Sequence, residues 1–72
     1  MEDVEIAKKI GLKIRELRIK KELSLYDLSF MLDIEYNSLI RIEKGRTNPT
    51  LKTLYNISKV LNVQLKDIVD VE

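Results

Sequence analysis

Lysine and arginine side chains crowd the first third of this chain and are its most conspicuous chemically active groups. Residues 8–21 hold seven bases against one acid, whereas acids gather near both ends of the chain. Clustered bases can bind phosphate groups, and their distribution matters more than the formal net charge of +1.

Other kinds of chemistry lack the residues that they require. The chain has no histidine and no cysteine, so neither a zinc site nor a disulfide framework is expected. It also lacks a Gly-rich phosphate loop and a carboxylate pair in a predicted cleft, so an enzyme with a small-molecule substrate is the least favoured class. We expect no metal and no cofactor. No signal peptide or long apolar run is present, which predicts a cytoplasmic protein that does not enter a membrane.

The elements that position these residues are expected to be helices. Leu, Ile, Lys and Glu dominate the composition, and the chain has only two Gly and one Pro, the residues that most often interrupt a helix. Apolar side chains recurring every three or four residues predict an all-α domain covering residues 1–72. The expected helices span residues 5–21, 25–32, 36–44, 50–61 and 65–69.

Several single residues support these bounds. Gly11 lies inside the first helix, where close packing against another element would explain a residue that costs about 1 kcal/mol relative to Ala. Glu35 is a possible cap at the start of the third helix. Asn62 is expected to end the fourth helix by adopting the left-handed conformation. The side chains expected to point inward from the fourth helix are Leu51, Leu54, Ile57, Val60 and Leu61.

The second and third helices are joined very tightly. Ser24 can cap the first of them with its hydroxyl, and Asp27 is a plausible partner for a capping box. Gly45 can close the second in the left-handed conformation. Only residues 33–35 separate the two helices. Two short amphipathic helices joined in this way predict a helix-turn-helix, whose second helix can enter the major groove of DNA.

The order of these motifs resembles the lambda-repressor-like helix-turn-helix family, also called XRE or Cro-type, over residues 10–69. The resemblance is carried by IRELR (14–18), LS (23–24), the segment 28–34, S-L-x-R-I-E-K-G (38–45) and N-P-T-L-x-T-L (48–54). It implies a compact five-helix lambda-repressor-like fold whose third helix is the recognition helix.

The resemblance also implies DNA contacts, residue by residue. Tyr36, Asn37 and Arg41 would point at bases, with Glu35 and Ser38 at the rim. Asn can bond adenine and Arg can bond guanine through paired hydrogen bonds, each discriminating by about 1–3 kcal/mol. Phosphates would be met by amides at the start of the second helix and by the side chains of Lys44, Arg46, Thr47, Asn48 and Lys52. The alternative for Asn37 and Arg41 is an ordinary solvated helix face. The alternative for Lys44, Arg46 and Lys52 is solubility, which the net charge does not exclude.

Two further expectations follow from the same resemblance. Arg18 and Glu43 would form a half-buried salt bridge between the first and third helices, which is a structural role. The fourth and fifth helices would make the contact of a two-fold dimer, with Ile68, Val69 and Val71 as candidates. The alternative is that these apolar residues only pack the fifth helix onto the core.

The sequence departs from the family pattern at three positions of the helix-turn-helix. Leu25 stands where Gln usually reaches a phosphate, Asp33 replaces the usual turn Gly, and Ile40 replaces a polar residue. Four other usually polar positions are also apolar: Leu12, Ile19, Tyr26 and Phe30. They form either a patch for a protein partner or extra core beneath Val4 and Ile6 of the N-terminal segment.

The leading hypothesis is a sequence-specific transcriptional regulator that binds double-stranded DNA at a palindromic operator as a homodimer. It is of bacterial, phage or plasmid type, and a repressor or autoregulator fits best. The alternative is a protein-interaction module on the same fold with weak or no DNA binding, which the low net charge, Leu25 and the apolar residues favour.

Overall fold

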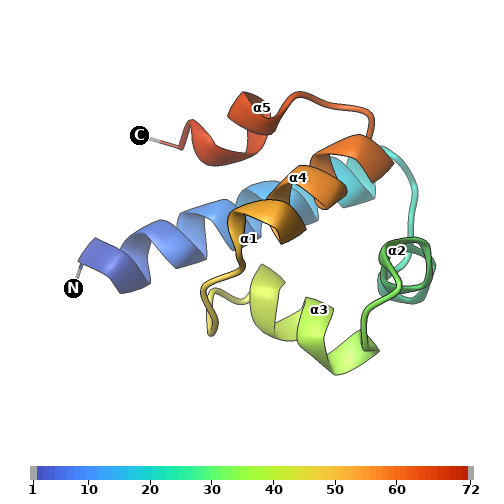
Figure 1. Cartoon of the computed structure of the whole chain (residues 1–72), viewed down its shortest axis with the longest axis horizontal. Helices are drawn as coiled ribbons and strands as arrows, with labels where there is room; N and C mark the ends of the chain where they lie inside the picture. The colour runs from blue at the N-terminus through green and yellow to red at the C-terminus, as the bar shows by residue number, and fades with distance from the viewer. Residues whose placement is uncertain (1, 72) are drawn as a thin grey trace.

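The computed structural model describes residues 2–71, with side chains from Glu5 onward. Within this range the chain has no strand and five helices (Figure 1): α1 (Glu2–Lys20), α2 (Leu25–Leu32), α3 (Tyr36–Glu43), α4 (Leu51–Val60) and α5 (Leu65–Val69). The fold is therefore all-α, as predicted. The first helix begins three residues earlier than expected, whereas the fourth begins only after its cap and ends at Val60. None of the helices described is long and apolar enough to cross a membrane.

Local capping explains where α2 begins and ends. The Asp27 amide donates to the Ser24 hydroxyl oxygen at 3.0 Å, and the Ser24 amide donates to the Asp27 carboxylate at 3.0 Å. These two bonds complete a capping box, which satisfies two of the donors that a helix start leaves open. At the other end Asp33 adopts the left-handed conformation with φ of 57°, which a short polar side chain tolerates.

Three other helix ends follow similar rules, whereas the start of α3 does not. Thr50 caps α4 by accepting a hydrogen bond from the Thr53 amide at 3.1 Å. Gly45 and Asn62 both have positive φ, of 71° and 58°, as the sequence predicts. The capping role expected for Glu35 is wrong, because its side chain makes no cap hydrogen bond at the start of α3.

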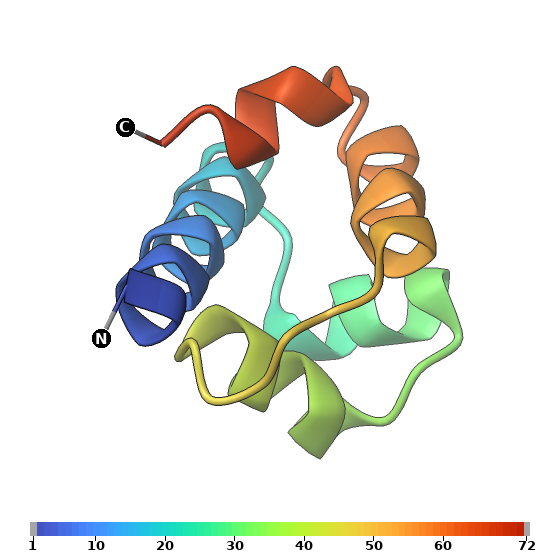
Figure 2. The ribbon, with the colours of Figure 1, turned by 60° about the vertical axis from the view of Figure 1, so that its left-hand side comes forward.

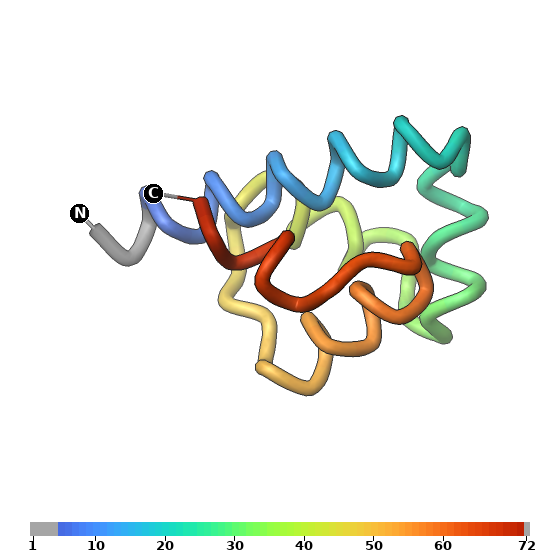
Figure 3. The backbone as a smooth tube through the Cα atoms, turned by 90° about the horizontal axis from the view of Figure 1, so that it is seen from above, coloured from blue at the N-terminus to red at the C-terminus, as the bar shows by residue number. Residues whose placement is uncertain are grey.

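The helices surround one apolar core. Figure 2 shows α1, α5 and α4 following one another round the molecule, with α2 and α3 closing the ring, and the view from above shows α1 running along one edge (Figure 3). Every helix contributes to the buried cluster, which consists of Ile14, Leu28, Leu39, Ile42, Leu54, Ile57, Leu61 and Ile68. Burial of these side chains is the main stabilising contribution to the fold.

Gly11 lies where α1 crosses the back of α3. A Cβ atom added there would lie 2.6 Å from the Glu43 carbonyl oxygen and closer still to that of Ile42. The glycine is buried, so the two backbones approach one another with no side chain between them. This contact anchors α3 against the longest helix of the molecule.

Two apolar residues do not point where the sequence analysis expected. Leu51 was expected to face inward but is 70% exposed, because it occupies the first turn of α4 at the edge of the core. Ile68 was a candidate for the dimer contact but has no exposed surface, because α5 turns it into the core. Ile68 is therefore not available for a contact with another chain in this conformation, and that expectation is wrong.

Candidate nucleic-acid interface

Helix α3 has one buried face and one exposed face. Leu39, Ile42 and Glu43 are buried against the rest of the molecule. Asn37, Arg41 and Lys44 are exposed and follow one another at spacings of four and three residues, so they share the outer face. This arrangement presents an amide, a guanidinium and an ammonium group side by side on the convex surface of one helix.

Arg18 and Glu43 hold α3 in place from behind. The Arg18 side chain donates from Nε to Glu43 Oε2 at 2.7 Å and from Nη2 to Oε1 at 3.1 Å. Its Nη1 donates to the Leu23 carbonyl oxygen at 2.8 Å, which adds the α1–α2 loop to the same network. The two residues are only 8% and 9% exposed. A paired and hydrogen-bonded charge is the form in which ionic side chains tolerate such burial.

Tyr36 is half-buried and does not stand alone at the start of α3. Its ring stacks on that of Tyr26 from α2, with 4.2 Å between the ring centroids and 17° between the planes. This contact was missed by the sequence analysis, which assigned Tyr36 to the DNA bases and Tyr26 to an apolar patch. No sequence signal joins two aromatic residues on different helices, so the pair becomes visible only in the fold.

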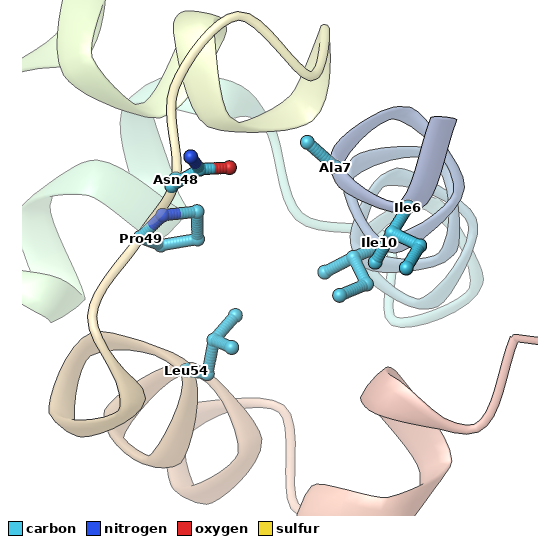
Figure 4. A pocket seen from close by; sticks show the side chains of 6 residues that line it. All are labelled: Ile6, Ala7, Ile10, Asn48, Pro49 and Leu54. Carbon is cyan, nitrogen blue, oxygen red and sulfur yellow. The ribbon is translucent and has the colours of Figure 1, made fainter. Parts of the chain in front are cut away.

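The basic and polar residues expected at phosphates do not all lie together. Arg46 and Thr47 are exposed in the loop that follows α3, and Lys52 is exposed in the first turn of α4. Glu35 is exposed and Ser38 is half-buried at the N-terminal end of α3. Asn48 differs, because its side chain points toward Ala7 across an open groove of about 360 Å³ (Figure 4).

Leu25 and Ile40, two of the departures from the family pattern, lie together in the fold. Both line a hollow of about 270 Å³ between α1, α2 and α3, with Leu12 beside them. Both are half-buried, so each covers apolar surface of the other helices. One signal for this contact was present in the sequence: both residues are apolar at positions that are usually polar in the family.

The four other unusually apolar residues are exposed, Phe30 most of all at 87%. Leu12 lines the hollow beside Leu25, whereas Tyr26 and Phe30 border a different depression with Ile34. Ile6 does not cover any of them, because it lines the groove of Figure 4 with Ile10 and Leu54. The alternative in which Ile6 covers these residues is therefore wrong, while the side chain of Val4 lies outside the described residues.

The capping box also affects the electrostatics at the start of α2. Hydrogen bonding from the Ser24 backbone amide, and secondly from its side chain, lowers the pKa of the Asp27 carboxyl group from its ordinary value. Asp27 therefore stays ionised into more acidic solution than a free aspartate, and the Ser24 amide that donates to it stabilises its charge.

Comparison with known proteins agrees with this geometry. The helix-turn-helix family HTH_3 matches residues 14–68. The chain is similar to the control protein C.BamHI of Bacillus amyloliquefaciens, with 38% identity over 61 residues, which cover 83% of this chain and 75% of that protein. It is also similar to an uncharacterized HTH-type transcriptional regulator of Archaeoglobus fulgidus, with 32% identity over 56 residues, covering 78% and 79% of the two chains.

A solved structure gives the same result. The restriction-modification controller protein C.AhdI from Aeromonas hydrophila superimposes with a TM-score of 0.84 at 25% identity, covering 94% of this chain and 98% of that one. The family match spans most of the chain and includes both helices of the motif, α2 and α3. The chain therefore belongs to the helix-turn-helix family HTH_3, the XRE or lambda-repressor-like class of DNA-binding transcription regulators.

Proposed function

We propose that this protein is a sequence-specific transcriptional regulator that inserts α3 into the major groove of a palindromic operator. The observation that supports this proposal best is the outer face of α3, where Asn37 and Arg41 are exposed while the opposite face is held by the core. Asn pairs with adenine and Arg with guanine in the major groove, and each such pair discriminates by about 1–3 kcal/mol. Tyr36, restrained by Tyr26, would meet the edge of the same site.

Contacts with the DNA backbone would come from both ends of the helix-turn-helix motif. The first-turn amides of α2 offer a dipole-assisted phosphate site. Lys44, Arg46, Thr47 and Lys52 would supply contacts on the other side, and the exposed Asn48 is the weakest candidate because of its direction. The net charge of only +1 predicts modest affinity for non-specific DNA.

A homodimer would place two copies of α3 one DNA turn apart, about 34–36 Å. With Ile68 buried, the apolar residues that could make the two-fold contact are Leu51 and Tyr55 on one face of α4, Val69 on α5, and the half-buried Val71 after it. Leu51 and Tyr55 are four residues apart, so they form one apolar strip. Two relatives named as control or controller proteins make an autoregulatory repressor the favoured role.

One observation favours a second candidate, a protein-interaction module. Tyr26, Phe30 and Met31 expose much of their apolar surface on the short helix α2. Exposed apolar groups gathered on a small protein often mark a partner. In this alternative the partner protein would bind α2, and DNA affinity would be weak or absent.

Titration of random-sequence duplex DNA at low salt separates the two candidates. A regulator binds, and its affinity falls steeply as salt is raised, because phosphate contacts release counterions. The absence of any binding at low salt would contradict the regulator and favour the module.

A further inference from the structure

One exposed stripe of α1 lies beside the recognition helix. Lys8, Leu12, Arg15 and Ile19 follow one another at spacings of four, three and four residues, so they share a helix face. All four are exposed. None of them was among the DNA contacts expected from the sequence.

Two contacts show where this stripe runs. A Cβ atom placed on Gly45 would lie 2.6 Å from Cγ of Lys8, so Lys8 packs against the turn that follows α3. Arg15 and Leu12 line the hollow whose other walls include Leu25 and Lys44. The stripe therefore borders both the first turn of α2 and the C-terminal end of α3.

The charges around the hollow are suited to an anion. Arg15 and Lys44 are exposed at its rim. Arg18 and Glu43, at its buried side, neutralise one another through a 2.7 Å ion pair. Among the side chains that the structure describes, no carboxylate lies within ion-pair distance of Arg15, so its charge is available for an external partner.

Leu25 gives a reason for such a partner at this place. Its position is the first residue of α2, where Gln usually reaches a phosphate in this family, and a leucine side chain cannot make that bond. Arg15 lines the same hollow as Leu25 and carries a guanidinium group, which can bind two phosphate oxygens at once.

We propose that α1 is a second backbone-binding element, in which Arg15 binds a phosphate of the DNA strand that passes the first turn of α2. Lys8 extends the same contact along that strand toward Arg46. The inference rests on the proposed function, since it assumes that α3 occupies the major groove. It adds a helix outside the motif to the DNA interface.

The test is the salt dependence of binding to one duplex by the wild type, Arg15→Gln and Lys9→Gln. Lys9 is exposed on the same helix but one residue away from the stripe, so its substitution removes the same charge without the contact. Log affinity falls linearly with log salt, and loss of one phosphate contact makes this line less steep by about 0.9. When salt is raised from 50 to 200 mM, the affinity of both proteins falls. The factor by which it falls should be about 3.5 times smaller for Arg15→Gln than for the wild type.

The other outcomes are equally informative. Lys9→Gln should keep the wild-type slope, and so should Arg15→Lys, because a cation remains at the phosphate. Equal slopes for Arg15→Gln and the wild type would overturn the contact, and so would equal reductions in Arg15→Gln and Lys9→Gln, which indicate a long-range charge effect. A wild type that binds no DNA would overturn the regulator itself as well as this contact. Circular dichroism should show an unchanged fold, since Arg15 is exposed.

Discussion

Substitution of Gly11 by alanine tests the packing that holds the recognition helix. Intrinsic helix propensity alone predicts that Gly11→Ala stabilises α1 by about 1 kcal/mol. The structure predicts the opposite sign. The new methyl carbon would lie 2.6 Å from the Glu43 carbonyl oxygen, and close carbon–oxygen contacts are seldom shorter than about 3.3 Å.

The magnitude follows from what must move. The obstacles on α3 are backbone atoms, so α1 and α3 must separate by about 0.7 Å or more to reach an ordinary contact. Overpacking of this kind costs about 1–3 kcal/mol, with the upper end expected where backbone meets backbone. After the gain in propensity is subtracted, the net destabilisation is about 2 kcal/mol.

Thermal and urea unfolding of Gly11→Ala measure this difference directly. A domain of this size loses about 4–8 °C of Tm per kcal/mol, so we expect a decrease of roughly 8–16 °C. Lys9→Ala is the matched control, since it introduces the same residue at an exposed position of α1 and should change stability by less than about 0.5 kcal/mol. A Gly11→Ala protein as stable as the wild type, or more stable, would refute the close approach of α1 and α3.

Three further predictions concern the buried ion pair behind α3, the capping box of α2 and the dimer contact. Glu43→Ala should lower the free energy of unfolding by about 3–5 kcal/mol, because it leaves Arg18 buried without its partner, whereas Arg18→Met combined with Glu43→Leu should cost much less; equal losses in urea unfolding would argue against a buried pair. Because the folded-state pKa of Asp27 is lowered, its stabilising contribution is present above the ordinary aspartate pKa and is lost as the pH falls through the lowered one. Asp27→Asn should therefore reduce the acid-side dependence of Tm, and an unchanged pH profile would contradict the capping box. Leu51→Glu should weaken self-association in analytical ultracentrifugation, and a dimer of undiminished strength would place the contact elsewhere.

Local signals made much of the fold predictable. Ser24 with Asp27, Gly45, Thr50 and Asn62 each act on the residues next to them, so their effects on helix ends can be inferred without tertiary structure. Where a local rule failed, as at Glu35, the helix starts without help from its side chain.

Orientation in the folded chain was harder to predict. Periodicity places Leu51 and Leu54 on related faces of α4, but it does not reveal that the first turn projects beyond the core and exposes Leu51. In the five-residue helix α5 too few positions repeat to decide that Ile68 points inward. The stack of Tyr26 on Tyr36 depends on the crossing of two helices, which no spacing along the chain encodes.

The candidate site combines both kinds of information. The sequence identified the hydrogen-bonding residues of α3, and the structure adds their exposure on one face and the buried Arg18–Glu43 pair behind them. The roles of Asn37 and Arg41 at bases stay predictions. These roles depend on contacts with DNA, which the packing within one chain does not determine.

Selection of bound duplexes from a random pool, carried out with the wild type, Arg41→Ala and Arg46→Ala, tests the central claim most directly. The wild type should enrich a palindrome whose half-sites are one helical turn apart. Arg41→Ala should lose the preference at one position of each half-site, whereas Arg46→Ala should bind all sequences more weakly with the preference unchanged. A pool with no enriched sequence, or one that is identical for the wild type and Arg41→Ala, would contradict the role of α3 as the recognition helix.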